Sequence, residues 1–322
     1  MSEPSPPPAD GPSTFADGVR LAIGTLSVFP VRPGVVDRRA GGIAMATAPL
    51  VGAVIGAGGG LVLMISLSLG TTPFLASVLA VVTVALLTRG LHLDGLADLA
   101  DGLGSAKPAE RALEIMKRSD IGPFGVMTLI FVLLVQVTAL WEAACAGAGT
   151  GAITLVAACA AGRLALTWAC RAGIPPARPD GLGAMVAGTV RRSVAVAVTV
   201  LVLAGTAALV YLHGVSAFDL WSSGSPSESS GAFERGYVAY ADITNYLPEI
   251  ESSIPGVGLM SGLGPFITPW GLPLAMLAGL LVAWAVRRRA VRRLGGVTGD
   301  VLGALVEIAT AATLLACTIL TN

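Results

Sequence analysis

The dominant feature of this sequence is a series of long apolar stretches, each near the length that crosses a bilayer. A transmembrane helix needs about 20 mainly apolar residues. Only 12% of the 322 residues are charged, whereas a soluble domain has about 25%. The sequence therefore predicts an all-α, polytopic integral membrane helix bundle of about seven transmembrane helices. The stretches lie at roughly 42–69, 73–88, 122–144, 151–170, 194–213, 270–287 and 301–320.

The distribution of basic residues predicts the orientation of these helices. Lys and Arg concentrate in the segments 32–41, 89–121, 171–193 and 287–300, and the alternate connections are nearly free of them. Membrane loops that are rich in Lys and Arg remain in the cytoplasm. We therefore expect a cytoplasmic N-terminus, an outer C-terminus and a multi-pass location in the cell membrane.

Three segments are expected to differ from the transmembrane stretches. Residues 1–14 are polar and proline-rich, which predicts a disordered tail. Segment 15–31 is too interrupted to span and predicts an interfacial helix or a re-entrant piece. Residues 214–269 are rich in Ser, Gly and acids, and they predict an outer-side insertion. The remainder of 15–322 is expected to form a single transmembrane domain.

Small residues recur along the first apolar stretch. Gly52, Gly56 and Gly60 are spaced by four, and such a face lets two helix backbones approach closely. Packing inside one bundle and dimerisation both satisfy this pattern, and we favour packing inside the bundle.

The segment Thr88–Gly125 contains the strongest candidates for chemistry. Asp94, Asp98 and Asp101 are spaced i, i+4 and i+7, so a helix places the three carboxylates on one face. Like charges this close repel unless they are neutralised, and Mg²⁺ is held by few carboxylates together with substrate phosphates. We predict these residues as metal ligands and as candidates for a catalytic base, with a solvated acidic face as the alternative. A glycine follows two of them, which favours close approach of a ligand.

Cations follow these carboxylates along the same segment. Arg111, Lys117 and Arg118 are predicted to bind substrate, because carboxylates for metal beside cations for phosphate oxygens are the parts of a phosphoryl-transfer site. The general excess of basic residues in cytoplasmic loops is the alternative explanation. His92, at the end of the second apolar stretch, is a further candidate base or hydrogen-bond donor, with a structural role as its alternative.

Four blocks of sequence stand out in order along the chain. They read HLDGLADLADGLGS (92–105), ALEIMKRSDIGPFG (112–125), ARPDGLGAMVAG (177–188) and GGVTGDVLGALVEI (295–308). These blocks resemble the cobalamin-5′-phosphate synthase family, also called adenosylcobinamide-GDP ribazoletransferases. The likeness covers nearly the whole chain except the tail and about 215–268. The chain departs from the family at residues 117–120, where Lys-Arg-Ser-Asp replaces the more usual Lys-Asp-Ser-Arg or Lys-Asp-Ser-His.

The resemblance implies a membrane transferase of the last assembly stage of vitamin B12. Such an enzyme joins adenosylcobinamide-GDP to α-ribazole or its 5′-phosphate, with Mg²⁺, and releases GMP. The implied partners are these substrates and the lipid bilayer, without nucleic acid, and self-association of the chain stays open. The transmembrane domain would then be catalytic, with its active site facing the cytoplasm, and the carboxylates Asp94, Asp98 and Asp101 would supply the metal ligands and the base.

Five further charged residues are predicted to bind substrate. Arg178 and Asp180 precede a glycine-rich loop that suits a ligand, and Asp300 precedes the last apolar stretch, where capping is the alternative role. Arg163 and Glu307 lie inside apolar stretches, where ionisable residues are costly and usually face the bundle interior or a wet cavity. We expect these two to pair with each other or to line the substrate cleft.

Two other classes of membrane protein remain as alternatives. A small-solute transporter predicts functional polar residues at mid-membrane with inverted repeats or broken helices, whereas the dense charge of this chain lies at one edge. A CDP-alcohol-type membrane phosphotransferase also uses an Asp-rich helix face with Mg²⁺, but its usual spacing of acidic residues is absent here.

Overall fold

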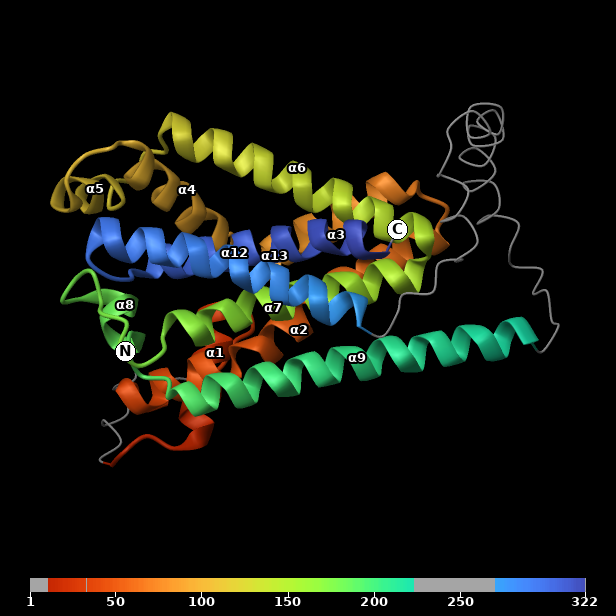
Figure 1. Cartoon of the computed structure of the whole chain (residues 1–322), viewed down its shortest axis with the longest axis horizontal. Coiled ribbons are helices and arrows are strands. Elements are labelled where there is room, and N and C mark those ends of the chain that lie inside the picture. The colour runs from red at the N-terminus through yellow and green to blue at the C-terminus, as the bar shows by residue number, and fades with distance from the viewer. Residues whose placement is uncertain (1–10, 33, 223–269, 322) are drawn as a thin grey trace, which may run out of the picture.

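The computed structural model describes residues 11–32, 34–222 and 270–321, of which residues 214–222 and 321 are described as backbone only. These residues form α-helices, most of which run along the long axis of the molecule (Figure 1). Six of the helices are long and apolar enough to cross a membrane, which confirms the predicted all-α membrane bundle. They are α2 (Arg38–Ser68), α6 (Pro123–Ala146), α7 (Ala148–Ala169), α9 (Arg192–Ser222), α12 (Gly271–Leu294) and α13 (Gly299–Thr321).

The second predicted stretch, 73–88, forms the first helix of a sharply bent pair. Helices α3 (Pro73–Leu87) and α4 (Leu91–Gly104) meet at an angle of 88°, and only together are they long and apolar enough to cross a membrane. Arg89 and Gly90 turn the chain with φ of 56° and 66°, a left-handed conformation that is uncommon outside glycine. The described residues therefore contain six helices that could cross the membrane, or seven spans if the bent pair is one broken span, which agrees with the predicted number of about seven.

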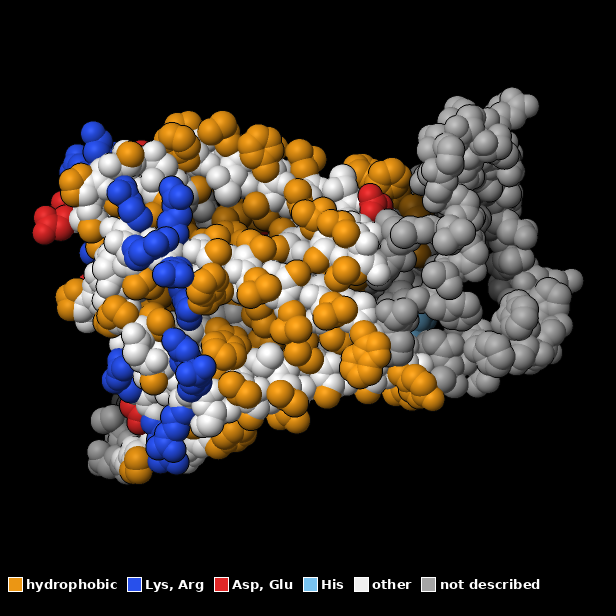
Figure 2. Space-filling view, in the orientation of Figure 1, with side chains coloured by type: hydrophobic (Ala, Val, Ile, Leu, Met, Phe, Trp, Pro, Cys, Tyr) orange, Lys and Arg blue, Asp and Glu red, His pale blue; other side chains and the backbone are white. Residues whose placement is uncertain are grey.

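The basic residues gather at one end of the bundle. Figure 2 shows a band of Lys and Arg at this end and a largely apolar surface along the described part of the spanning helices. Helices α1 (Phe15–Leu26), α5 (Ala109–Ile115) and α8 (Gly181–Val186) lie at the same end, together with α4 (Figure 1). The predicted interfacial segment 15–31 thus contains the short helix α1, which packs against α2.

The boundaries of the tail and of the insertion differ from the prediction. Ser13 is buried, and its Oγ donates a hydrogen bond to Asp37 Oδ1 at 2.7 Å. Thr14 caps α1, so Ser13 and Thr14 belong to the folded structure although they lie in the predicted tail. Helix α9 continues to Ser222, beyond the predicted end of its span at residue 213. Residues 1–10 and 223–269 lie outside the described residues.

The glycines of α2 form its contact with α7, the most buried of the six spanning helices. A Cβ atom at Gly56 would lie 2.7 Å from Val156 Cα, and one at Gly60 would lie 3.1 Å from Ala152 Cβ. Real Cβ atoms essentially never approach other heavy atoms as closely as 2.7 Å, so a side chain at Gly56 would force the helices apart. The spacing of small residues therefore serves packing within the bundle, as predicted.

Candidate active site

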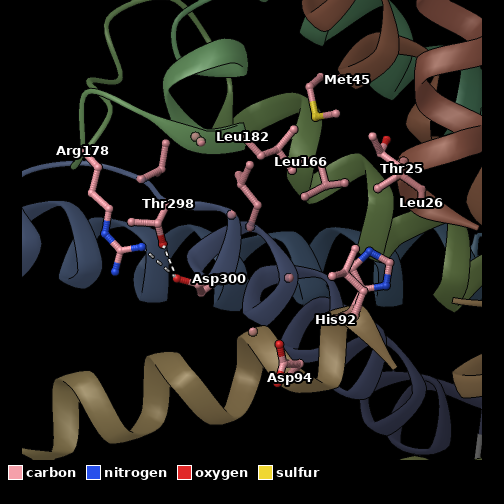
Figure 3. A pocket seen from close by; sticks show the side chains of 18 of the residues that line it. Thr25, Leu26, Met45, His92, Asp94, Leu166, Arg178, Leu182, Thr298 and Asp300 are labelled. Atoms are coloured by element: carbon pink, nitrogen blue, oxygen red, sulfur yellow. Dashed lines mark hydrogen bonds and ion pairs between the residues drawn. The ribbon is translucent and has the colours of Figure 1, made fainter. Parts of the chain in front are cut away.

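A cavity of about 280 Å³ opens at the basic end of the bundle. It is surrounded by α1, α4, α7, the loop that leads into α8 and the start of α13 (Figure 3). Apolar side chains such as Leu26, Met45 and Leu166 form part of its wall. The cavity brings together five of the predicted site residues, which are His92, Asp94, Arg178, Asp180 and Asp300.

Close packing of α4 on α13 brings two of these carboxylates together. A Cβ atom at Gly95 would lie 2.7 Å from the backbone carbonyl oxygen of Asp300, and one at Gly303 would lie 3.2 Å from His92 Cα. The absence of side chains at both glycines lets Asp94 on α4 approach Asp300 on α13. Gly95 thus accommodates the neighbouring helix and also lines the cavity, and its role in admitting a ligand stays a prediction.

Asp300 is held in the cavity wall by two side chains (Figure 3). Thr298 Oγ1 donates to Asp300 Oδ2 at 3.3 Å, and Arg178 Nη1 lies 3.7 Å from the same oxygen. Arg178 Nη2 also donates to the backbone oxygen of Leu113 at 2.6 Å, which ties the cavity to α5. Thr298 Oγ1 accepts from Val301 N at 3.2 Å, so Thr298 is the residue that caps α13 and Asp300 is left to face the cavity.

Asp98 lies one helical turn after Asp94 and is partly buried. Burial, together with the negative charges of Asp94, Asp300 and Asp101, raises the pKa of Asp98 to about 7. Both causes disfavour the ionised form of a carboxyl group. The crossing of α4 and α13 therefore concentrates negative charge that a proton or a cation would neutralise.

Asp101 has a different environment from the other two carboxylates of α4. Its Oδ2 accepts from Gly122 N at 2.7 Å and its Oδ1 accepts from Gly125 N at 2.9 Å. Both oxygens thus bind the N-terminus of α6, where unpaired N–H groups and the helix dipole favour an acid. The structure does not gather the three predicted metal ligands, Asp94, Asp98 and Asp101, into one site. Within the described ranges, no group of three or more His, Cys, Asp or Glu side chains is placed to hold a metal ion.

The predicted cations of the same segment lie outside the cavity. Arg111, Lys117 and Arg118 are exposed on α5 and the turn that follows it, and Arg111 forms an ion pair with Glu114. None of the three lines the cavity. Arg178 is the predicted cation that the fold does bring there.

Arg163 and Glu307 are buried behind the cavity rather than in its lining. Arg163 Nη2 lies 3.4 Å from His92 Nδ1, and Glu307 Oε2 accepts from Gln136 Nε2 at 2.8 Å. The expected direct ion pair between Arg163 and Glu307 is not formed, because each has its own polar partner. Arg163 therefore contacts the cavity through His92, which is part of the lining.

Sequence reasoning missed two polar residues of this region. Thr298 precedes a Gly-Asp pair and the last apolar stretch, which is a helix-capping pattern that would have identified it. Gln136 is a single polar residue in the middle of an apolar stretch, a position that often marks an internal polar contact.

The donors around the cavity fit a hard divalent cation of the Mg²⁺ type. Such an ion prefers oxygen ligands and is often bound through one or two carboxylates plus the phosphates of a substrate. Asp94 and Asp300 provide carboxylates from two helices in one cavity, with Asp98 nearby. This donor set suits a metal that is shared with substrate rather than one enclosed by protein ligands.

The fold and this cavity define a polytopic membrane protein with a carboxylate-rich site at its basic end. The chain belongs to the cobalamin-5-phosphate synthase family, whose model matches residues 18–318. A protein of Frankia casuarinae named adenosylcobinamide-GDP ribazoletransferase is 40% identical over 305 residues, which are 92% of this chain and 92% of that protein. The resemblance seen in the four sequence blocks is thereby confirmed.

Other relatives with the same name show similar coverage. The protein of Bradyrhizobium diazoefficiens is 37% identical over 89% of this chain and 87% of its own length. That of Corynebacterium efficiens is 33% identical over 96% of this chain and 93% of its own length. No solved structure matches the chain.

Proposed function

We propose that this chain is an adenosylcobinamide-GDP ribazoletransferase that joins adenosylcobinamide-GDP to α-ribazole or its 5′-phosphate and releases GMP. Near full-length similarity to proteins of that name supports the proposal. The structural observation that carries it is one cavity in which Asp94 and Asp300 lie with Arg178. All three residues fall within the part of the chain that the family model matches.

The reaction needs a base for the attacking hydroxyl group and a cation for the phosphates. A ribose hydroxyl oxygen forms a bond to the phosphorus attached to cobinamide, the bond from that phosphorus to GMP breaks, and the hydroxyl proton must be accepted. Asp98 is proposed as the acceptor, because it is a partly buried carboxyl group that lies one helical turn after Asp94 of the cavity, and a positioned carboxylate can act as a general base. Arg178 is proposed to bind phosphate oxygens, for which its planar guanidinium is well suited.

The same proposal assigns the predicted metal ion to the cavity carboxylates. Asp94 and Asp300 would hold Mg²⁺, which when bound would neutralise the diphosphate and the charge that develops on the leaving GMP. In this assignment Asp300 takes the place that sequence spacing gave to Asp101, because both oxygens of Asp101 bind the backbone of α6.

The cavity is proposed to face the cytoplasm from the cell membrane. Its residues lie at the end that carries the band of Lys and Arg (Figure 2), and such residues are retained on the cytoplasmic side. A Lys107→Cys variant tests this assignment, since Lys107 is exposed at that end. Because the native Cys145 is only partly buried, the variant also carries Cys145→Ser, and its introduced thiol should react with a membrane-impermeant maleimide only after the cells are lysed. Labelling in intact cells would contradict the cytoplasmic assignment.

The reaction itself is tested with the purified protein in detergent. Adenosylcobinamide-GDP, Mg²⁺ and either α-ribazole or its 5′-phosphate are mixed with the protein, and GMP and the corrinoid product are separated by chromatography. Equal amounts of GMP and product are expected, and absence of GMP with both acceptors would overturn the function. Asp98→Asn should abolish release, whereas Asp120→Asn, at an exposed position, should not. Release that persists in EDTA would overturn the metal assignment alone.

A further inference from the structure

A second hollow of the molecule is an apolar groove among the spanning helices. It lies between α7, α9, α12 and α13 and has a volume of about 510 Å³, within the roughly 300–1,000 Å³ typical of ligand sites. Its lining is apolar except for Thr199 and Arg287. Leu281 and Trp284 of this lining are also exposed on the outside of the bundle, so the groove is accessible from the zone that the membrane surrounds.

The walls of the groove need no polar partner from an occupant. Trp168 Nε1 donates to Thr199 Oγ1 at 2.9 Å, so the two polar groups of the apolar wall satisfy each other. The remaining wall is aliphatic or aromatic. An occupant of this part of the groove is therefore selected by its apolar character, as a hydrocarbon chain would be.

One end of the groove carries two neighbouring cations. Arg287 lines the groove, is buried, and donates from Nη1 to the backbone oxygen of Trp168 at 2.6 Å. Arg171, just after α7, is close enough for its charge to act on Arg287, and its buried Nε has no hydrogen-bond partner. Neither arginine forms an ion pair with a carboxylate in the described part of the chain.

We propose that this groove binds an anionic diacyl phospholipid, with an acyl chain along the apolar wall and the phosphate at Arg171 and Arg287. Two adjacent guanidinium groups repel each other unless an anion lies between them, and guanidinium groups bind phosphate oxygens well. Basic pockets between transmembrane helices recognise anionic lipid head groups in this way. Along the groove the apolar wall comes first and the cations follow at the basic end of the bundle. A lipid in one leaflet has the same arrangement, with its acyl chains inside the membrane and its phosphate at the surface.

Native mass spectrometry of the purified full chain tests the proposal. The protein in detergent is titrated with phosphatidylglycerol or with phosphatidylcholine, and the bound lipids are counted. Wild-type protein should bind phosphatidylglycerol at least about fivefold more tightly, and Arg171→Gln should remove about fivefold of that affinity, the factor expected for one lost contact between a cation and the lipid. Arg289→Gln, at an exposed position of α12, is the matched control and should bind as wild type does.

Several outcomes would overturn the lipid site. Equal affinity of the wild-type protein for the two lipids would do so, and this measurement does not depend on the folding of any variant. An equal loss of affinity for phosphatidylglycerol in Arg171→Gln and Arg289→Gln would show that the total charge of this end, and not a specific site, attracts the lipid.

Leu281→Trp fills the groove from its exposed rim and should weaken binding of phosphatidylglycerol; unchanged binding would place the lipid elsewhere. Competition by free glycerol 3-phosphate would assign the cations to a soluble phosphate, and a dimer that Leu281→Trp abolishes would assign the groove to a second copy.

Discussion

Helix α4 carries the dipeptide Asp-Gly twice, and the two copies perform different tasks. Asp94 near its start is exposed, lines the cavity, and has no side-chain hydrogen bond or ion pair with the described residues. Asp101 near its end is buried and binds two backbone N–H groups of α6. The comparison shows that the helical spacing sets the shared face, while the element that packs against each carboxylate decides its role.

The largest expected effect is a loss of activity when Asp94, but not Asp101, is replaced. Asp94→Asn should lower the rate of GMP release by about 100-fold or more, since it removes a charge that faces the reacting phosphates. The melting temperature should stay near that of wild type, because Asp94 makes no bond that stabilises the fold. Glu110→Gln, at an exposed position of α5, should leave both quantities unchanged. If the Asp94→Asn protein were both inactive and unstable, Asp94 would not differ from Asp101 in its role in the fold, and this prediction would be wrong.

Asp101→Asn should show the reverse pattern. An asparagine side chain presents one acceptor and one NH₂ group, so one of the two backbone N–H groups of α6 would lose its acceptor and face another donor. Loss of a hydrogen bond to a charged group costs about 1.5–3 kcal/mol, which denaturant unfolding in detergent would measure. Folded protein should keep its dependence on Mg²⁺ concentration. A rise in the Mg²⁺ requirement with normal stability would return Asp101 to the metal site.

The two glycines should differ in activity in the same direction as the aspartates that precede them, but in stability in the opposite direction. A Cβ at Gly95 meets the backbone of Asp300, whereas a Cβ at Gly102 lies 2.6 Å from the flexible side chain of Met116. Gly95→Ala should therefore displace α4 from α13 and cost about 1–3 kcal/mol of stability, together with activity. Gly102→Ala should cost less, because Met116 can change its rotamer. Unfolding and GMP release are measured in parallel for the two variants. Equal effects of Gly95→Ala and Gly102→Ala would contradict this prediction.

The smallest effects concern the cations. Arg178→Gln should raise KM for adenosylcobinamide-GDP by about tenfold, as expected for a lost charged hydrogen bond to substrate. Arg111→Gln should change kcat/KM by less than about twofold, since its exposed ion pair with Glu114 contributes little. Steady-state kinetics of the two variants would compare them directly. A larger change in Arg111→Gln than in Arg178→Gln would mean that the substrate contacts α5 rather than the cavity wall.

The comparison also shows how far sequence can predict this site. The apolar stretches, the helix that carries Asp94 and the choice of Arg178 and Asp300 as site candidates follow from local composition and spacing, and both candidates line the cavity. The role of Asp101 does not, because its partners Gly122 and Gly125 are more than twenty residues away and only tertiary packing places them opposite its carboxylate. The same limit applies to Arg111, which is exposed on α5 and does not line the cavity, although its charge and neighbours resemble those of a phosphate-binding residue.

The short length of α3 has a consequence for how the protein is made. Its 15 residues rise only about 22 Å, less than the roughly 30 Å of a bilayer core, and the bend after Leu87 prevents α4 from extending it. Helix α3 packs against the longer α2 across a tight turn. We therefore expect α3 to depend on its contact with α2 for its place in the membrane, and the two helices to insert as one hairpin during synthesis. In that case the charged helix α4 follows directly behind them at the membrane surface.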